Sequence, residues 1–242
     1  LMPEYPEIAV CVERLRDPTQ LQSTPDGAGL RAVHGLGRLR GEPAIRVVHV
    51  ITRMILGGAQ ENTLLTCEGL LRRGHDVLLL TGPTTGPEGE LLGEAARRNV
   101  PVEEVPGLVR PIAPLKDWRA CRRLRERFRA LRPDVVHTHS SKAGVLGRIA
   151  ARKAGVPIVV HTIHGLPFHR YQDPLRNWLY ARAESYAARR CDRIICVADA
   201  MTRQAVAAGV APPDHFATVH SGMEVEPFVA ARSQREDMRA RL

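Results

Sequence analysis

From Ile45 onward, short β-branched runs alternate with longer amphipathic stretches. The runs IRVVHVIT, HDVLLLTG and IVVHTIHG have the continuous apolar composition of strands that are buried on both faces. Between them, apolar residues recur three and four positions apart, which is the spacing of an amphipathic helix. Strands interleaved with helices of this length predict an α/β fold with a doubly wound, mostly parallel sheet.

The same pattern predicts where the elements and the domain lie. It predicts strands at 45–52, 75–82, 100–105, 134–139, 157–162 and 192–197, and helices at 59–73, 88–98, 115–131, 141–154, 174–190 and 199–208. We expect one domain over residues 45–220. Residues 1–44 contain proline and glycine without a sustained period and are expected to form a loose extension. Residues 221–242 are expected to be an inter-domain linker and the truncated start of a carboxyl-terminal part.

Composition narrows the class of protein. Of the 242 residues, 44% are hydrophobic and 25% are charged, as in a soluble globular protein. No apolar run approaches the roughly 18 residues that a membrane helix needs. Five cysteines without a close CxxC pair argue against a disulfide framework and a zinc ribbon, and favour a reducing cytoplasm.

A net charge of +9 indicates an anionic partner. Only 4% of the residues are aromatic, which argues against a nucleic-acid module that stacks bases, so a phosphate-bearing ligand or an anionic membrane surface fits better. The helix at 115–131 is strongly basic, and its apolar residues recur at helical spacing. These are Leu115, Trp118, Leu124, Phe128 and Leu131. The helix is either a solvated outer helix of the sheet or a site that docks on anionic lipid head groups.

Histidines end two successive predicted strands. DVVHTHSSKAG carries His137 and His139, and IVVHTIHG carries His161 and His164. Ligands of such folds bind at the carboxyl ends of the strands, so this placement indicates a site. A histidine pair can bind a metal, act as an acid or base, or donate hydrogen bonds to a phosphate or hydroxyl. Asp134 begins its strand and belongs to the opposite edge, which counts against a metal or hydrolase site.

The turn RMILGGAQEN joins the first strand to the first helix. Gly57 and Gly58 let the backbone approach a ligand closely, and the helix that follows presents free amides to an anion. The turn matches neither GxGxxG nor a Walker loop. A tight turn that needs glycine for steric reasons alone remains the alternative.

Taken together, these segments resemble a known family. The stretches IRVVHVITRMILGGAQEN, RPDVVHTHSSKAGVLGR, VVHTIHG, CDRIICVADAMTRQAV and VHSGMEVEPF are similar, in this order, to the amino-terminal domain of glycosyltransferase family 4. The resemblance spans about 46–228. It implies a retaining enzyme of two Rossmann-like domains, the GT-B architecture, of which this chain is the acceptor-side half. Ser221-Gly222-Met223 departs from the Asn-Gly-Val that the family often has, which puts one donor contact in doubt.

The resemblance also implies roles for individual residues. His139, matched to the residue that faces the acceptor, and His164, matched to the residue near the donor sugar, are expected to be catalytic. Residues of the same motifs are expected to bind donor or acceptor, namely Gly57, Gly58, Gln60, His137 and Lys142. No metal or other cofactor is expected. The resemblance also implies front-face attack, in which the leaving diphosphate itself helps to take the acceptor proton.

The expected function is therefore the acceptor-binding half of a glycosyltransferase. It would move a sugar from a nucleotide-sugar donor to a cell-envelope glycolipid or polysaccharide, in the cytoplasm or peripherally on the inner face of the membrane. The family's second domain binds most of the donor, so residues 1–242 alone are expected to be inactive. A non-catalytic module that binds a membrane or a partner is the alternative, and a sugar-nucleotide epimerase or a metal hydrolase is a third hypothesis.

Overall fold

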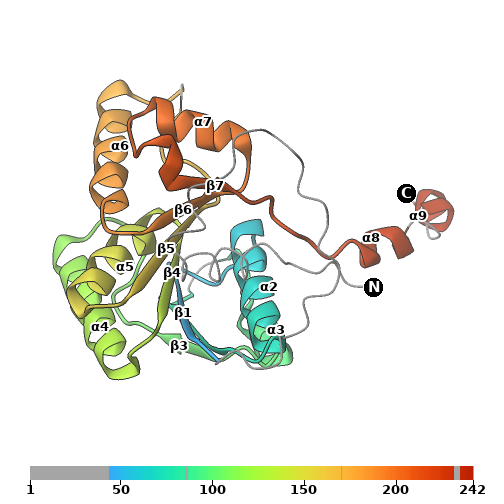
Figure 1. The fold of residues 1–242 in the computed structure, drawn as a ribbon. Coiled ribbons are helices and arrows are strands. Elements are labelled where there is room, and N and C mark those ends of the chain that lie inside the picture. Colours follow the sequence, from blue (N-terminus) through green and yellow to red (C-terminus); the bar gives the residue numbers. More distant parts are fainter. Residues whose placement is uncertain (1–43, 85–86, 170, 232–234, 242) are drawn as a thin grey trace.

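The computed structural model describes residues 44–241 except 85–86, 170 and 232–234. Its centre is a seven-stranded sheet in the order β3-β2-β1-β4-β5-β6-β7, and every neighbouring pair of strands is parallel (Figure 1). The predicted doubly wound α/β fold is confirmed. Residues 1–43, which hold almost all of the expected extension at 1–44, lie outside the described residues.

The elements alternate along the chain as the hydrophobic pattern predicts. The strands are β1 (Arg46–Ile51), β2 (Asp76–Thr81), β3 (Val102–Glu104), β4 (Val135–His139), β5 (Ile158–Ile163), β6 (Arg193–Cys196) and β7 (Phe216–Thr218). The helices are α2 (Gly58–Arg72), α3 (Leu92–Arg97), α4 (Pro114–Leu131), α5 (Ser141–Ala154), α6 (Pro174–Ala188), α7 (Asp199–Ala207), η2 (Pro213–His215), α8 (Glu226–Ala231) and α9 (Arg235–Arg241).

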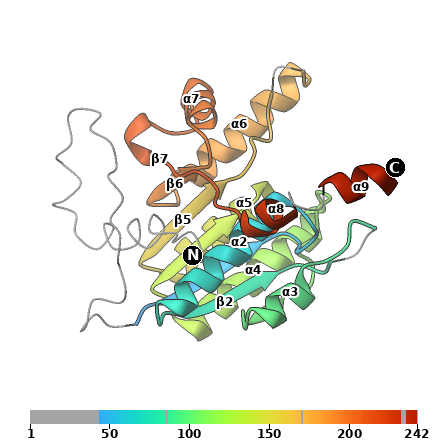
Figure 2. The ribbon, with the colours of Figure 1, turned by 90° about the vertical axis from the view of Figure 1, so that its right-hand side faces the viewer.

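Helices cover both faces of the sheet, and each face has its own apolar core. On one face, Leu124 and Phe128 of α4 pack with Val136 and Val159 of the strands. On the other face, Leu64 and Leu70 of α2 pack with strand residues of the opposite parity. Figure 2 shows α2 and α3 in front of the sheet and α4 behind it. Alternate strand residues therefore face different helix layers, and this alternation decides which histidines can meet.

The apolar residues of the basic helix α4 do not share one buried face, although they recur at helical spacing. Leu124 and Phe128 are buried, but Leu115 and Trp118 are 61% and 59% exposed. At 3.6 residues per turn, Leu115 lies on the side of α4 opposite the stripe of Ala120, Leu124 and Phe128, and Trp118 lies about a third of a turn from that stripe. The apolar residues of α4 therefore form a buried stripe and a separate exposed group.

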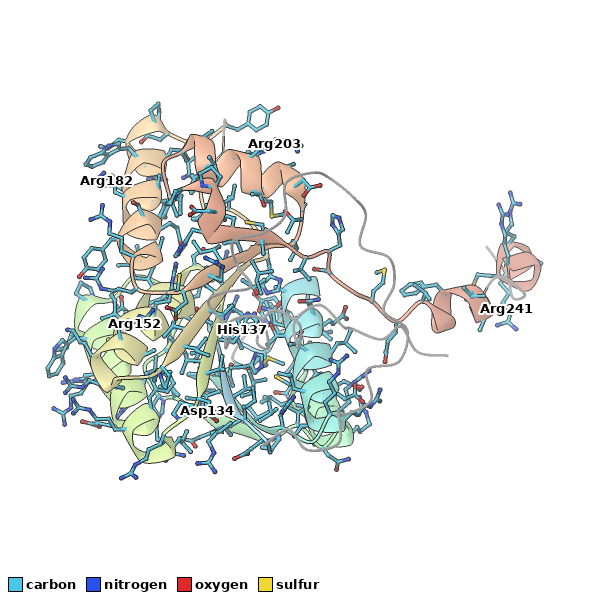
Figure 3. The ribbon with its side chains drawn as sticks, in the orientation of Figure 1. Asp134, His137, Arg152, Arg182, Arg203 and Arg241 are labelled. Atoms are coloured by element: carbon cyan, nitrogen blue, oxygen red, sulfur yellow. The ribbon has the colours of Figure 1, made fainter. Side chains whose placement is uncertain are left out.

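Several other elements differ from the prediction. The strand β3 and the helix α3 are shorter than expected, and β7 was not predicted. The three residues of β7 complete one edge of the sheet beside β6, and such a short edge strand carries little hydrophobic pattern. After β7 the chain leaves the sheet, and α8 and α9 extend away from it toward Arg241 (Figures 1 and 3). None of the described helices is long and apolar enough to cross a membrane.

Candidate functional site at the carboxyl edge of the sheet

Three neighbouring strands bring histidines together on the α2 face of the sheet. His49 of β1 pairs in register with His137 of β4, and His139 pairs with Thr162 of β5. All three histidines share the parity of the residues that face α2, and they are at most 2% exposed. Figure 3 shows His137 in the interior, while Asp134 lies toward the other end of the same strand, as predicted. His49 was missed by the sequence analysis.

Hydrogen bonds join these rings to His164, which follows β5. His49 Nδ1 lies 3.0 Å from His139 Nε2, and His139 Nδ1 lies 3.1 Å from His164 Nε2. His137 takes a different partner, since its Nε2 lies 2.7 Å from the Thr162 hydroxyl. The site thus contains a chain of three imidazoles, His49, His139 and His164, with His137 packed beside it.

Burial keeps these rings neutral. Desolvation lowers the pKa of His49 to about 3 and that of His164 to about 4. The pKa values of His137 and His139 are also well below their usual range, first because of burial and then because of repulsion from neighbouring histidines. At neutral pH each ring therefore offers one N–H donor and one bare nitrogen acceptor.

His161 does not belong to this group, although the sequence places it next to His164. Its parity directs it to the other face of the sheet, where Nδ1 lies 3.0 Å from the Thr138 hydroxyl. A Cβ added to Gly144 of α5 would lie 2.4 Å from the His161 ring. His161 therefore packs against α5 through a position that only glycine fits.

The glycine turn opens onto the main cleft at this edge. Gly57 precedes α2 with an extended backbone, and its carbonyl accepts from the amides of Gln60 and Glu61 at 3.1 and 3.0 Å. Gly58 and His164 both line a cleft of about 740 Å³, together with residues 221–224. The turn and the end of β5 therefore meet around one cavity.

A smaller cavity adjoins His164 at the start of α5. It measures about 250 Å³ and is bordered by Ser140, Ser141, His164 and Glu184, among others. Ser140 has a φ of 60°, a strained value for a residue with a side chain. Its hydroxyl lies 2.8 Å from that of Thr52, which accepts from the Ala143 amide. These contacts hold the β4–α5 turn against the end of β1.

Three predicted binding residues are engaged by the protein itself. Lys142 forms an ion pair with Asp117 at 2.5 Å and also donates to the carbonyl of Pro111. The Gln60 amide donates to the carbonyl of Arg53 at 3.3 Å, and His137 is buried. None of the three lines either of the two cavities. Their roles in donor or acceptor binding stay predictions.

An ion-pair cluster of one arginine and three glutamates, which the sequence analysis missed, borders the main cleft. Arg98, which follows α3, donates to Glu224 through two hydrogen bonds of 2.9 Å and also to Glu68 and Glu94. Glu224 raises the pKa of Arg98, and Arg98 in turn lowers the pKa of Glu224. This cluster holds the segment after β7 along the cleft.

The histidine group also has a spacing compatible with a metal ion. One nitrogen from each of His49, His137 and His139 lies within 4.8 Å of the others. Neutral imidazoles are good transition-metal ligands. The group of described residues contains no carboxylate or thiolate to offset the charge of a buried dication. We therefore describe these rings as a hydrogen-bonded cluster.

Comparisons with known proteins show which sequences and folds this chain is similar to. A galactosyltransferase of Escherichia coli, UDP-Gal:alpha-D-GlcNAc-diphosphoundecaprenol alpha-1,3-galactosyltransferase, is 33% identical over 187 residues, covering 77% of this chain and 47% of the relative. The chain thus spans about half the length of that curated relative.

Solved structures show the same fold. A glycosyltransferase from Rickettsia africae aligns with a TM-score of 0.60 at 16% identity, over 78% of this chain and 46% of that chain. A UDP-GlcNAc 2-epimerase from Neisseria meningitidis aligns with a TM-score of 0.52 at 12% identity, over 79% of this chain and 51% of that chain. Because a transferase and an epimerase both align, the fold alone does not distinguish them.

The sequence match is more specific than the fold. The family described as "Glycosyl transferase 4-like domain" matches residues 57–222, from the glycine turn through the histidine-bearing strand ends to the segment that borders the cleft. The resemblance inferred from the sequence is thereby confirmed, and this chain belongs to the glycosyl transferase 4-like domain family.

Proposed function

We propose that this chain is the acceptor-side half of a retaining glycosyltransferase that moves a sugar from a nucleotide-sugar donor to a lipid-linked glycan of the cell envelope. The observation that carries the proposal is the cleft at the carboxyl edge, where Gly58 and His164 meet within the family-matched segment. The E. coli relative, by its name, transfers galactose to a GlcNAc diphosphate lipid, which supports this acceptor class.

The chemistry follows from the neutral state of His164. A histidine with a pKa of about 4 is a weak base at neutral pH, so it is poorly suited to deprotonate a sugar hydroxyl. A neutral ring can still donate a hydrogen bond to a hydroxyl or a phosphate oxygen. In this mechanism the leaving diphosphate takes the acceptor proton, and fixed donors around the cleft stabilise the charge that develops on it.

A chimaera tests the role of His164. Residues 1–242 are joined to the carboxyl-terminal half of the E. coli galactosyltransferase, and galactose transfer is measured. We expect His164→Ala to lower kcat at least tenfold, which is about 1.4 kcal/mol of barrier. His75→Ala is the control, because His75 precedes β2 at the opposite edge. Equal losses in both variants would contradict a specific role for His164.

The glycine turn gives a second prediction. A Cβ on Gly58 would meet no heavy atom within 4 Å, so Gly58→Val should change the free energy of unfolding by less than about 1 kcal/mol. The side chain would instead enter the cleft, and we expect at least tenfold weaker acceptor binding by calorimetry.

Gly69→Val is the matched control for this experiment. Gly69 lies on the same helix, also has free space around its Cβ, and does not border the cleft. Unchanged acceptor binding by both variants would show that Gly57 and Gly58 only shape the turn.

We also propose that the enzyme binds the anionic inner face of the membrane peripherally. Helices that connect parallel strands begin at the carboxyl edge of the sheet, so α4 and α6 start at the same edge as the cleft. At these starts Leu115 and Trp118 of α4, and Leu175 and Trp178 of α6, are each more than half exposed. Basic residues flank both groups, namely Lys116, Arg119, Arg122, Arg176 and Arg182. Exposed tryptophan and leucine beside arginine suit a lipid interface.

Vesicle co-sedimentation tests the membrane proposal. We expect Trp118→Ala combined with Arg119→Gln and Arg122→Gln to weaken binding to anionic vesicles several-fold, and added salt to weaken binding of the parent. The charge-matched control replaces Arg129 and Lys153 with glutamine at the far ends of α4 and α5. Binding that is indifferent to the triple change and to salt would contradict the proposal.

A further inference from the structure

The imidazole chain of His49, His139 and His164 connects the core to the cleft through consecutive ring nitrogens. Each link joins a nitrogen of one ring to a nitrogen of the next, at 3.0 and 3.1 Å. His164 is the ring that borders both cavities, and His49 is the ring that is completely buried. His139, the middle ring, uses both of its nitrogens in these hydrogen bonds.

Neutrality couples the tautomers of the three rings. A neutral imidazole has one N–H and one bare nitrogen, so both hydrogen bonds of the chain must run in the same direction. If they run outward, His49 donates to His139 and His139 donates to His164, whose own proton then lies on Nδ1. If they run inward, the proton of His164 lies on Nε2 and Nδ1 is bare. The tautomer of His49 therefore determines which ring nitrogen of His164 carries the proton.

The buried end of the chain favours the outward direction. His49 Nε2 is buried and has no hydrogen-bond partner among the residues that the structure describes. The inward direction would place a proton on this nitrogen and leave an N–H donor unsatisfied in the core. The outward direction leaves a bare nitrogen there instead. Unsatisfied buried N–H groups are rarer in proteins than under-satisfied acceptors, which makes the outward state the more stable one.

We propose that His49, acting through His139, holds His164 in the tautomer that carries its proton on Nδ1, so that His164 donates a hydrogen bond to an oxygen of the ligand in the cleft. Among the described residues, Nδ1 of His164 has no partner, and this leaves it for the ligand. The inference rests on the proposed function, and it adds a positioning role for His49. The oxygen it recognises belongs to a phosphate or a hydroxyl, both of which accept from an N–H.

Side-chain geometry offers a conservative replacement for His49. The amide nitrogen of asparagine takes nearly the place of histidine Nδ1, so His49→Asn keeps a donor facing His139. His49→Leu has a comparable volume and no donor. The two variants therefore separate the loss of a hydrogen-bond donor from a change in packing.

The test is the tautomer of each histidine in residues 1–242, measured by nitrogen-15 NMR of the ring nitrogens at pH 7.5 after treatment with a chelator. In the parent, we expect His164 to be protonated at Nδ1 and bare at Nε2. In His49→Leu, the His164 signals should move toward the other tautomer or a mixture, and in His49→Asn they should return to the parental pattern. In the active chimaera, the Leu variant should lower kcat at least tenfold with little change in KM, and the Asn variant should recover most of it.

Two results would overturn the inference. One is a parental His164 that carries its proton on Nε2, which needs no variant and so stands even if His49→Leu does not fold. The other is an unchanged His164 tautomer in a folded His49→Leu protein, judged by its backbone amide spectrum. The ring measurement requires no substrate, so it succeeds or fails independently of whether the chimaera transfers a sugar.

Discussion

We expect the free energy of unfolding to fall steeply as the pH is lowered from about 6.5 toward 4. A histidine in the unfolded chain has a pKa of about 6.5, whereas the folded-state pKa is about 3 for His49 and about 4 for His164. Below pH 6.5 the unfolded state therefore binds protons that the folded state does not bind, and the free energy of unfolding decreases as the pH falls. The loss for each ring is complete only once its folded pKa is reached.

The cost of keeping these histidines unprotonated in acid is large compared with the free energy of unfolding of the domain. Each such histidine costs about 1.4 kcal/mol per pH unit below 6.5, so His49 and His164 together cost about 4 kcal/mol at pH 5. His137, His139 and His161 have lowered pKa values too and steepen the loss. Domains of this size are stable by only about 5–15 kcal/mol, which predicts acid unfolding between pH 4 and 6.

Circular dichroism against pH measures this transition. His49→Asn should move the midpoint to lower pH, because it removes one ring that the folded state keeps unprotonated. Arg119→Gln, which changes only surface charge, should leave the midpoint in place. A free energy of unfolding that is constant between pH 7 and 5 would contradict the buried, neutral state of the cluster.

Arg148→Met should destabilise the domain by about 3–5 kcal/mol, because it leaves the carboxylate of Glu184 buried without its partner. Arg148 is completely buried in α5 and Glu184 of α6 is 3% exposed. The arginine donates to Glu184 at 2.8 Å and to the Gly144 carbonyl at 2.8 Å. The pair therefore links the two helices that flank the small cavity.

Urea unfolding of a double-mutant cycle checks this expectation. The double variant Arg148→Met with Glu184→Leu removes both charges and should recover much of the loss. The ion pair of Arg122 and Glu126 is the matched control, because both of its side chains are more than half exposed, and Arg122→Met should cost less than about 1 kcal/mol. If Arg148→Met alone were as stable as the double variant, Arg148 and Glu184 would not depend on each other as a buried pair.

Hydrophobic pattern was sufficient to predict the architecture and the edge at which the site lies. The predicted and observed bounds of α5 coincide, because only Ser140 separates Ser141 from the buried strand β4, and Gly155 ends the helix with a left-handed φ of 79°. The pattern could not predict β7, whose three residues lie at the sheet edge. The exposure of Leu115 agrees with the helical spacing, which places Leu115 on the side of α4 opposite Leu124.

Side-chain partners account for what the sequence analysis missed in the site. His49 pairs in register with His137, but it lies two residues before the end of β1, so the strand-end pattern that marks His139 and His164 does not include it. The parity of His161 separates it from His164, three residues later, across the sheet. Lys142 follows a predicted site motif, yet Asp117 of α4 holds it, and contacts between distant segments of this kind leave no local signal. These differences arise from tertiary packing.

The most direct test of the proposed acceptor site is an NMR titration of nitrogen-15-labelled residues 1–242 with a short-chain analogue of a GlcNAc diphosphate lipid. Chemical-shift changes at Gly58, Ser141 and His164, with none at Asp134 and Gly155 on the opposite edge, are the result we predict. Changes confined to the opposite edge, or no change up to about 1 mM ligand, where binding would be weaker than about 4 kcal/mol, would contradict an acceptor site at the carboxyl edge of this sheet.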